Sequence, residues 1–213
     1  MIPRLIAVEI AILSAQAVLY FGCEVFQHDH RDVRKRIDDR IPLIPAAAFA
    51  YVSWFPLIAL FPLVLYHLSP FEYAVYQVSI IVSDLASTAI YLAYPTSFER
   101  PALSDHGGSF AEKLLRVIYR GDFKGSNCSP SLHCIQSFII MMSAFCCPFL
   151  PGPAEGVIIF ICLAIVAATL LTKQHVLTDV VTAMPAAVLA YAAGRLITGY
   201  AGYEQLLSFA GLL

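Results

Sequence analysis

The sequence predicts an all-α, polytopic membrane protein in which six spanning helices form one bundle. Of 213 residues, 59% are hydrophobic and only 13% are charged, and the mean hydropathy is +0.74. Soluble domains carry roughly 25% charged residues. Several stretches reach the roughly 20 apolar residues that a spanning helix needs. No repeat or long linker divides the chain, so residues 1–213 are expected to form a single domain.

The first three spans are expected at residues 5–23, 43–66 and 73–94, each an apolar stretch bounded by polar residues. The charged run at residues 28–40 cannot enter hydrocarbon, and we interpret it as a solvated connector rather than a binding site. Asp84 falls near the middle of the third span, where a carboxyl group is costly in lipid. Its side chain is therefore expected to face the interior of the bundle.

A long polar connection at residues 95–130 is expected after the third span, because it is punctuated by proline and glycine. It contains an amphipathic segment that we expect to form a short helix at the membrane interface. The apolar face of that helix consists of Phe110, Leu114, Leu115 and Ile118. The last three spans are expected at residues 132–150, 156–172 and 176–200, with a tight Pro-Gly-Pro turn at 151–153. Six spans place both termini on one side and the polar motifs on the other.

His175 and Asp179 open the sixth span and are four residues apart, so on a helix their side chains share a face. The carboxylate then accepts one ring N–H of the imidazole and leaves the other ring nitrogen available. An imidazole is able to attack phosphorus and form a covalent phosphohistidine. The pair is thus suited to act as a base or as a nucleophile toward a phosphoester.

A second group of polar residues opens the fourth span. Pro130 suits the first turn of a helix, so the backbone N–H groups of Ser131, Leu132 and His133 are expected to face the interface unpaired. Such helix ends bind phosphate. As an imidazolium, His133 is able to give a proton to a departing alcohol oxygen. Arg100, after the third span, adds a permanently charged clamp with bidentate geometry.

In the motifs SFERP, NCSPSLHC and TKQHVLTDV, the sequence resembles the type 2 phosphatidic acid phosphatase superfamily. It is most similar to the branch that contains sphingomyelin and inositol phosphorylceramide synthases. The likeness extends over most of the chain through six spans and their order. It implies a metal-independent reaction without a cofactor, in which His175 is the nucleophile, Asp179 its partner and His133 the general acid.

The sequence departs from the superfamily pattern at its cationic positions and at one glycine. Ala93 stands where the first motif has a lysine, and Ala168 and Thr169 stand where the third has Ser-Arg. Leu132 replaces the glycine of the second motif, as PSLH does in the synthase-like branch. The candidates to replace the missing cations are Lys173, Lys124 and Arg120. Lys173 is favoured because it lies two residues before the third-motif histidine, although a lysine at a helix end also snorkels without a functional role.

The charge balance argues against a nucleic-acid-binding protein. The chain carries 13 basic and 15 acidic residues, and no basic face is visible. The HDH sequence at 28–30 resembles a set of metal ligands, but such residues in a charged loop are more often simply solvated, so we predict no metal site. The expected partners are a lipid phosphate substrate and membrane lipids. The oligomeric state is left open.

We expect an integral multi-pass protein of the cell (inner) membrane, and two arguments disagree about the side that its active site faces. All of the 13 lysines and arginines except Arg4 and Arg195 fall on the motif side. The positive-inside rule would make that side cytoplasmic. The family resemblance implies the opposite, a site that faces the periplasm, a lumen or the cell exterior. The sequence leaves both orientations open.

Three functions are compatible with these motifs. The preferred one is a phosphatase acting on phosphatidate, phosphatidylglycerol phosphate or an isoprenyl pyrophosphate, which the small size of the chain favours. The alternative is a phosphotransferase that passes a headgroup to a lipid alcohol, which PSLH favours. The third is a non-enzymatic transporter or scaffold, in which Asp84 would mark a pathway. That function leaves the clustered histidines unexplained.

Overall fold

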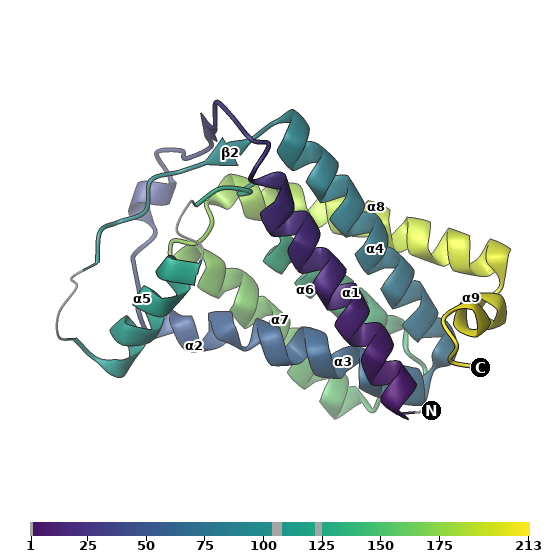
Figure 1. Ribbon diagram of the computed structural model, residues 1–213. Helices are drawn as coiled ribbons and strands as arrows, with labels where there is room; N and C mark the ends of the chain where they lie inside the picture. Colours follow the sequence, from purple (N-terminus) through teal and green to yellow (C-terminus); the bar gives the residue numbers. More distant parts are fainter. Residues whose placement is uncertain (1, 104–107, 122–124) are drawn as a thin grey trace.

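The computed structural model describes residues 2–103, 108–121 and 125–213 and is mostly helical (Figure 1). Within these residues, five helical stretches are long and apolar enough to cross a membrane, which is consistent with a multi-pass membrane protein. They are α1 (Ile2–Cys23), the consecutive pair α2 (Ala47–Val52) and α3 (Trp54–Leu68), α4 (Pro70–Ala93), α7 (Gly152–Leu171) and α8 (Leu177–Ala201).

The helix expected at residues 132–150 is shorter than predicted. It is α6 (Leu132–Cys146), and its 15 residues rise about 22 Å, against a hydrocarbon core of about 30 Å. The helix ends because Pro148 supplies no backbone N–H to continue it. Despite its length, α6 lies at the centre of the bundle, where Ile135, Ile139 and Ile140 are fully buried.

The predicted second span is interrupted at Ser53, between α2 and α3. Two local features explain the interruption. Pro56 has no N–H to donate to the carbonyl of Val52, four residues earlier. In addition, the Ser53 hydroxyl donates to the carbonyl of Ala50 at 2.6 Å, a bond that often bends helices. The stretch Ala47–Leu68 still forms one candidate span, as expected at residues 43–66, but its helix is broken at Ser53.

Helices α4 and α8 pack closely because a glycine faces a serine. A Cβ atom at Gly194 would lie 2.1 Å from Ser79 Oγ and 2.8 Å from the carbonyl oxygen of Val75. Further along α4, Asp84 is buried and accepts a hydrogen bond from Gln136 Nε2 of α6 at 3.3 Å. The prediction that Asp84 faces the interior of the bundle is therefore confirmed.

The amphipathic segment does form a helix, α5 (Phe110–Gly121). Ser109 caps it, since its hydroxyl accepts the Glu112 N–H at 3.3 Å while the Glu112 carboxylate accepts the Ser109 N–H at 2.6 Å. The predicted apolar face is partly covered by protein. Leu115 is fully buried, and the ring of Phe110 stacks on Phe49 of α2 with 5.9 Å between centroids.

The loops that follow α1, α4, α5 and α7 gather at one end of the bundle, and both termini lie at the other end (Figure 1). Strands β1 (Arg31–Asp32) and β2 (Thr96–Ser97) pair in parallel, and Ser97 forms an isolated bridge with Ser126. The short 3-10 helix η1 (Asp38–Arg40) lies in the first of these loops, and α9 (Tyr203–Phe209) follows α8 near the C-terminus. Three loops far apart in sequence are thereby joined at the end where the polar motifs lie.

Candidate functional site

His175 and Asp179 form a buried pair at the start of α8. His175 Nδ1 lies 3.2 Å from Asp179 Oδ2, the same oxygen that accepts the Val176 N–H at 3.0 Å. The Asp179 side chain is completely buried, and its Oδ1 has no hydrogen-bond partner among the described residues. An unsatisfied buried carboxylate oxygen costs stability, and such a cost often marks a functional site. The carboxylate thus fixes the orientation of the imidazole through Nδ1, and this is the contact that the spacing predicted.

His133 lies opposite His175 with 5.8 Å between the two ring centroids. Its imidazole is held between two aromatic rings, Tyr51 at 4.7 Å and Trp54 at 4.3 Å. These two ring contacts fix the position of the His133 imidazole opposite His175. His133 Nε2 is buried and has no hydrogen-bond partner among the described residues.

Ser131 has a structural role that the sequence analysis did not anticipate. It is the N-cap of α6, and its hydroxyl accepts the Cys134 N–H at 3.4 Å. Its own N–H donates to the carbonyl of Asp179 at 3.3 Å, which links the starts of α6 and α8. Pro130 therefore precedes the helix instead of occupying its first turn. The predicted phosphate-binding N–H groups are reduced to those of Leu132 and His133.

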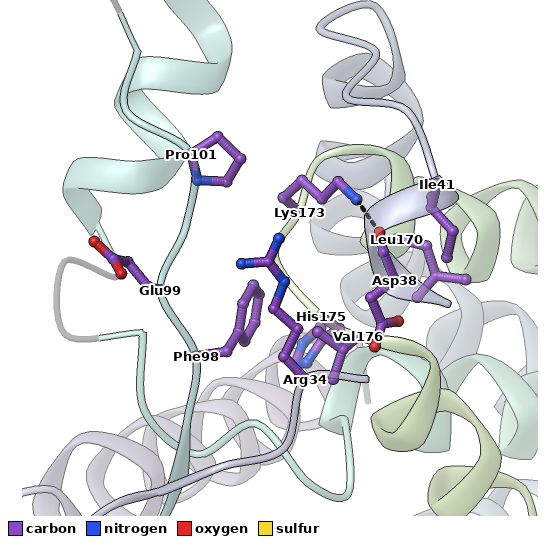
Figure 2. A pocket seen from close by; sticks show the side chains of 10 residues that line it. All are labelled: Arg34, Asp38, Ile41, Phe98, Glu99, Pro101, Leu170, Lys173, His175 and Val176. Carbon is purple, nitrogen blue, oxygen red and sulfur yellow. Dashed lines mark hydrogen bonds between the residues drawn. The ribbon is translucent and has the colours of Figure 1, made fainter. Parts of the chain in front are cut away.

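A small pocket beside His175 combines two cations with a buried carboxylate. The cations are Arg34 and Lys173, and the carboxylate belongs to Asp38. Figure 2 shows the Arg34 guanidinium and the Lys173 side chain together above the His175 ring. Arg34 also forms an ion pair with the exposed Asp39. Two cations beside an imidazole make this pocket suited to bind a phosphate group.

Asp38 anchors this pocket to the start of α8. Its Oδ1 accepts the Leu177 N–H at 2.7 Å, and its Oδ2 accepts the Lys35 N–H at 2.7 Å. Its backbone carbonyl accepts a hydrogen bond from Lys173 Nζ, also at 2.7 Å. The solvated connector expected at residues 28–40 is therefore wrong at Asp38, which is only 3% exposed. The loop folds against the histidine site instead.

The backbone of Lys173 adopts a conformation that usually favours glycine. Its φ is +54°, at the position just after the C-cap residue Thr172 of α7. A non-glycine residue there costs of order 1 kcal/mol, so a side-chain role is a natural explanation. Burial lowers the pKa of Lys173 below its usual value, although the charge of nearby Asp38 opposes that shift. The predicted position of Lys173 beside His175 agrees with the structure.

Arg100 does not line this pocket, although its neighbour Pro101 does. Its guanidinium lies 5.4 Å from the centre of the Tyr119 ring of α5. Burial raises the pKa of Tyr119 to about 12, while the charge of Arg100 opposes the shift. The neutral phenol donates a hydrogen bond to the carbonyl of Thr172 at 2.8 Å. Arg100 therefore lies beside the helix that braces the site, and its role as a phosphate clamp stays a prediction.

The remaining candidates lie away from the pocket or outside the described residues. Arg120 is exposed on α5, and Lys124 lies outside the residues that the structure describes. His28 and Asp29 are exposed, while His30 Nε2 lies 3.3 Å from Gln27 Oε1. Among the described residues, no cluster of three or more His, Cys, Asp or Glu side chains is placed to hold a metal ion. We assign no residue as a metal ligand.

Arg34 and Asp38 are the site residues that sequence reasoning missed. Both lie in a charged run whose members look equivalent in the sequence. The one available signal was their place on the motif side of the membrane. That signal is weak, because most charged residues of the chain lie on this side. Only the folding of the loop over α8 distinguishes Asp38, which is buried, from the neighbouring Asp39, which is exposed.

Comparison with known proteins identifies no family for this chain. No protein-family model, curated protein or solved structure matches it.

We expect Asp38→Asn to destabilise the fold by about 1–3 kcal/mol, because the new amide cannot satisfy both the Leu177 and the Lys35 N–H groups. Thermal unfolding of the purified protein in detergent would measure the loss. The matched control is Asp29→Asn, which changes an exposed aspartate of the same loop. Equal unfolding temperatures for the two variants would show that Asp38 does not anchor the loop.

Proposed function

We propose that this protein is an integral membrane enzyme that hydrolyses a lipid phosphate through a phosphohistidine intermediate on His175. The candidate substrates are phosphatidate, phosphatidylglycerol phosphate and isoprenyl pyrophosphates, as the resemblance of its motifs to the type 2 phosphatidic acid phosphatases implies. The observation that carries the proposal is the buried His175–Asp179 pair with His133 opposite, beside a pocket that holds Arg34 and Lys173.

In the first step, His175 Nε2 attacks the phosphorus atom of the bound lipid phosphate. A bond forms between this nitrogen and phosphorus, and the bond from phosphorus to the lipid oxygen breaks. His133 gives its proton to the leaving oxygen, so a phosphomonoester releases a lipid alcohol and an isoprenyl pyrophosphate releases an isoprenyl monophosphate. Asp179 accepts a hydrogen bond from the Nδ1–H of His175, so the proton stays on Nδ1. Its negative charge stabilises the positive charge that develops on the ring.

In the second step, water attacks the phosphohistidine. His133, now neutral, accepts a proton from that water, and the bond between His175 and phosphorus breaks to release inorganic phosphate. Arg34 and Lys173 offset the negative charge on the phosphoryl oxygens in both steps. An alcohol in place of water would give transfer instead of hydrolysis, which is the phosphotransferase alternative.

The proposed membrane arrangement has six spans, with α6 as the short central one and α5 lying at the interface. The exposed apolar side chains of Phe110 and Val117 support the interfacial position of α5. We propose the cell (inner) membrane as the location. The charge distribution favours an active site that faces the cytoplasm, whereas the family resemblance favours one that faces outward. Reporter fusions to either terminus would decide between the two orientations, because both termini lie opposite the site.

The proposal is tested by offering the purified protein a panel of lipid phosphates in detergent with a metal chelator present. We expect inorganic phosphate release and an acid-labile phosphoprotein when the reaction is quenched early. A second arm adds a lipid alcohol as acceptor. If a new phospholipid forms and no inorganic phosphate is released, the protein is a phosphotransferase and not a phosphatase. No product and no phosphoprotein from any member of the panel would overturn the proposal.

Lys173→Gly separates a functional lysine from a structural one. Glycine suits the positive φ at this position, so the loss of the bond to Asp38 should be offset and thermal stability should change by less than about 1 kcal/mol. We expect kcat/KM to fall about tenfold or more through the loss of a phosphate-binding cation. Undiminished kcat/KM would show that Lys173 does not bind phosphate and only extends its charged end toward the interface.

A further inference from the structure

A large apolar cavity lies next to His133, on elements that the polar pocket does not use. It measures about 560 Å³, against about 30 Å³ for the pocket beside His175. Its walls come from α1, α2, α3, α5 and the start of α6. Small-molecule sites have volumes of roughly 300–1,000 Å³, so the cavity is large enough for a ligand. The polar pocket is large enough only for a small group.

Three side chains that line this cavity have a buried polar atom without a hydrogen-bond partner among the described residues: Gln16 Oε1, Trp54 Nε1 and His133 Nε2. Gln16 of α1 lines the cavity and is only 8% exposed, and its Oε1 has no hydrogen-bond partner among the described residues. Glu9, another buried polar residue of α1, accepts hydrogen bonds from Tyr73 at 2.8 Å and Gln77 at 2.5 Å. Glu9 is therefore explained by packing within the bundle, whereas Gln16 is not. A buried amide oxygen without a partner is costly unless a ligand satisfies it.

We propose that this cavity binds the apolar chain of the substrate and that Gln16 selects a lipid phosphate with a hydroxyl group beside that chain. This inference rests on the proposed function, because it places the phosphate at the two histidines, and it favours lipid phosphates with a free hydroxyl over the phosphatidate and isoprenyl pyrophosphates named there. His133 lines the cavity and faces His175, so a chain in the cavity leads directly to the reacting phosphate. A hydroxyl both donates and accepts, and thus pairs with either end of the Gln16 amide.

Helix α5 connects the chain cavity to the phosphate pocket. Leu114, Val117 and Ile118 of α5 contribute to the cavity wall. On the same helix, Tyr119 donates its hydroxyl to Thr172, next to the Lys173 of the polar pocket. A chain held beneath α5 is therefore placed by the same helix that braces the phosphate-binding loop.

Occupancy of the cavity can be read without catalysis, because Trp54 lines it and is the only tryptophan of the chain. We expect a hexadecyl phosphate brominated along its chain to quench Trp54 fluorescence saturably, and unlabelled hexadecyl phosphate to reverse the quenching. Ala17→Phe fills the cavity and should weaken this binding about tenfold or more, whereas Ala15→Phe, an exposed position of α1 outside the cavity, should not.

Selectivity is tested with 1-O-hexadecylglycerol 3-phosphate and its 2-O-methyl ether, which differ only in the free hydroxyl. The unmodified protein should bind the hydroxyl compound about tenfold more tightly, and Gln16→Leu should remove that difference. Two results would overturn the cavity assignment: quenching that rises linearly and is not reversed by competitor, or equal quenching in Ala17→Phe and Ala15→Phe. A preference that survives Gln16→Leu would overturn the role of Gln16. Saturable binding without phosphate release would leave this inference standing and remove the proposed function.

Discussion

His175→Ala is expected to lower lipid phosphate hydrolysis by at least about 10⁴-fold, because no other described side chain occupies the position of its Nε2. The start of α8 should persist, since Asp179 Oδ2 still accepts the Val176 N–H. The lost bond to a buried carboxylate costs about 1–3 kcal/mol, which thermal unfolding in detergent would record. The labelled phosphoprotein should disappear together with phosphate release.

The matched control is His67→Ala, because His67 is exposed and lies at the end of α3 remote from the loops. That variant should hydrolyse lipid phosphates at the unmodified rate. Should His175→Ala remain folded and retain full turnover, His175 would not be the nucleophile. If turnover falls while a phosphoprotein still accumulates, the covalent bond is made by another residue.

The main features of the helical fold were predictable because they depend on local patterns. Apolar length located α1, α4, α7 and α8 to within a few residues, and the polar segment before the fourth span was correctly placed beside the sixth. The break at Ser53 was not predicted, because it depends on a hydroxyl bond to Ala50 combined with the absent N–H of Pro56. The two strands were missed for another reason: they are two residues long and form only across loops.

The site divides in the same way. The contact between His175 and Asp179 was predicted from their spacing of four residues, although His175 lies just before the N-cap residue Val176 and not on α8 itself. The aromatic rings that hold His133 come from α2 and α3, and nothing near His133 in the sequence indicates them. Arg34 reaches the pocket because buried Asp38 binds the start of α8, a contact across 139 residues of sequence. Local spacing predicts contacts between residues close in the sequence, whereas a loop that folds over a distant helix leaves no periodic signal.

Arg34→Met is expected to lower kcat/KM for lipid phosphates by ~10²–10³-fold. The guanidinium lines the pocket beside His175, and removing one donor aimed at a developing oxyanion typically costs this much. Stability should change little, because the side chain is 47% exposed and its ion pair with Asp39 is also at the surface. Steady-state kinetics on the best substrate of the panel would measure the effect.

Two variants of the same loop separate a specific phosphate contact from a general effect of charge. Arg36→Met removes an exposed arginine that does not line the pocket and should leave kcat/KM unchanged. Asp39→Asn releases Arg34 from its competing carboxylate and should preserve or raise kcat/KM, since the guanidinium is then free to contact phosphate. Equal losses in the Arg34 and Arg36 variants would mean that the loop attracts anionic lipid by its net charge. Arg34 would then have no specific place in the phosphate site.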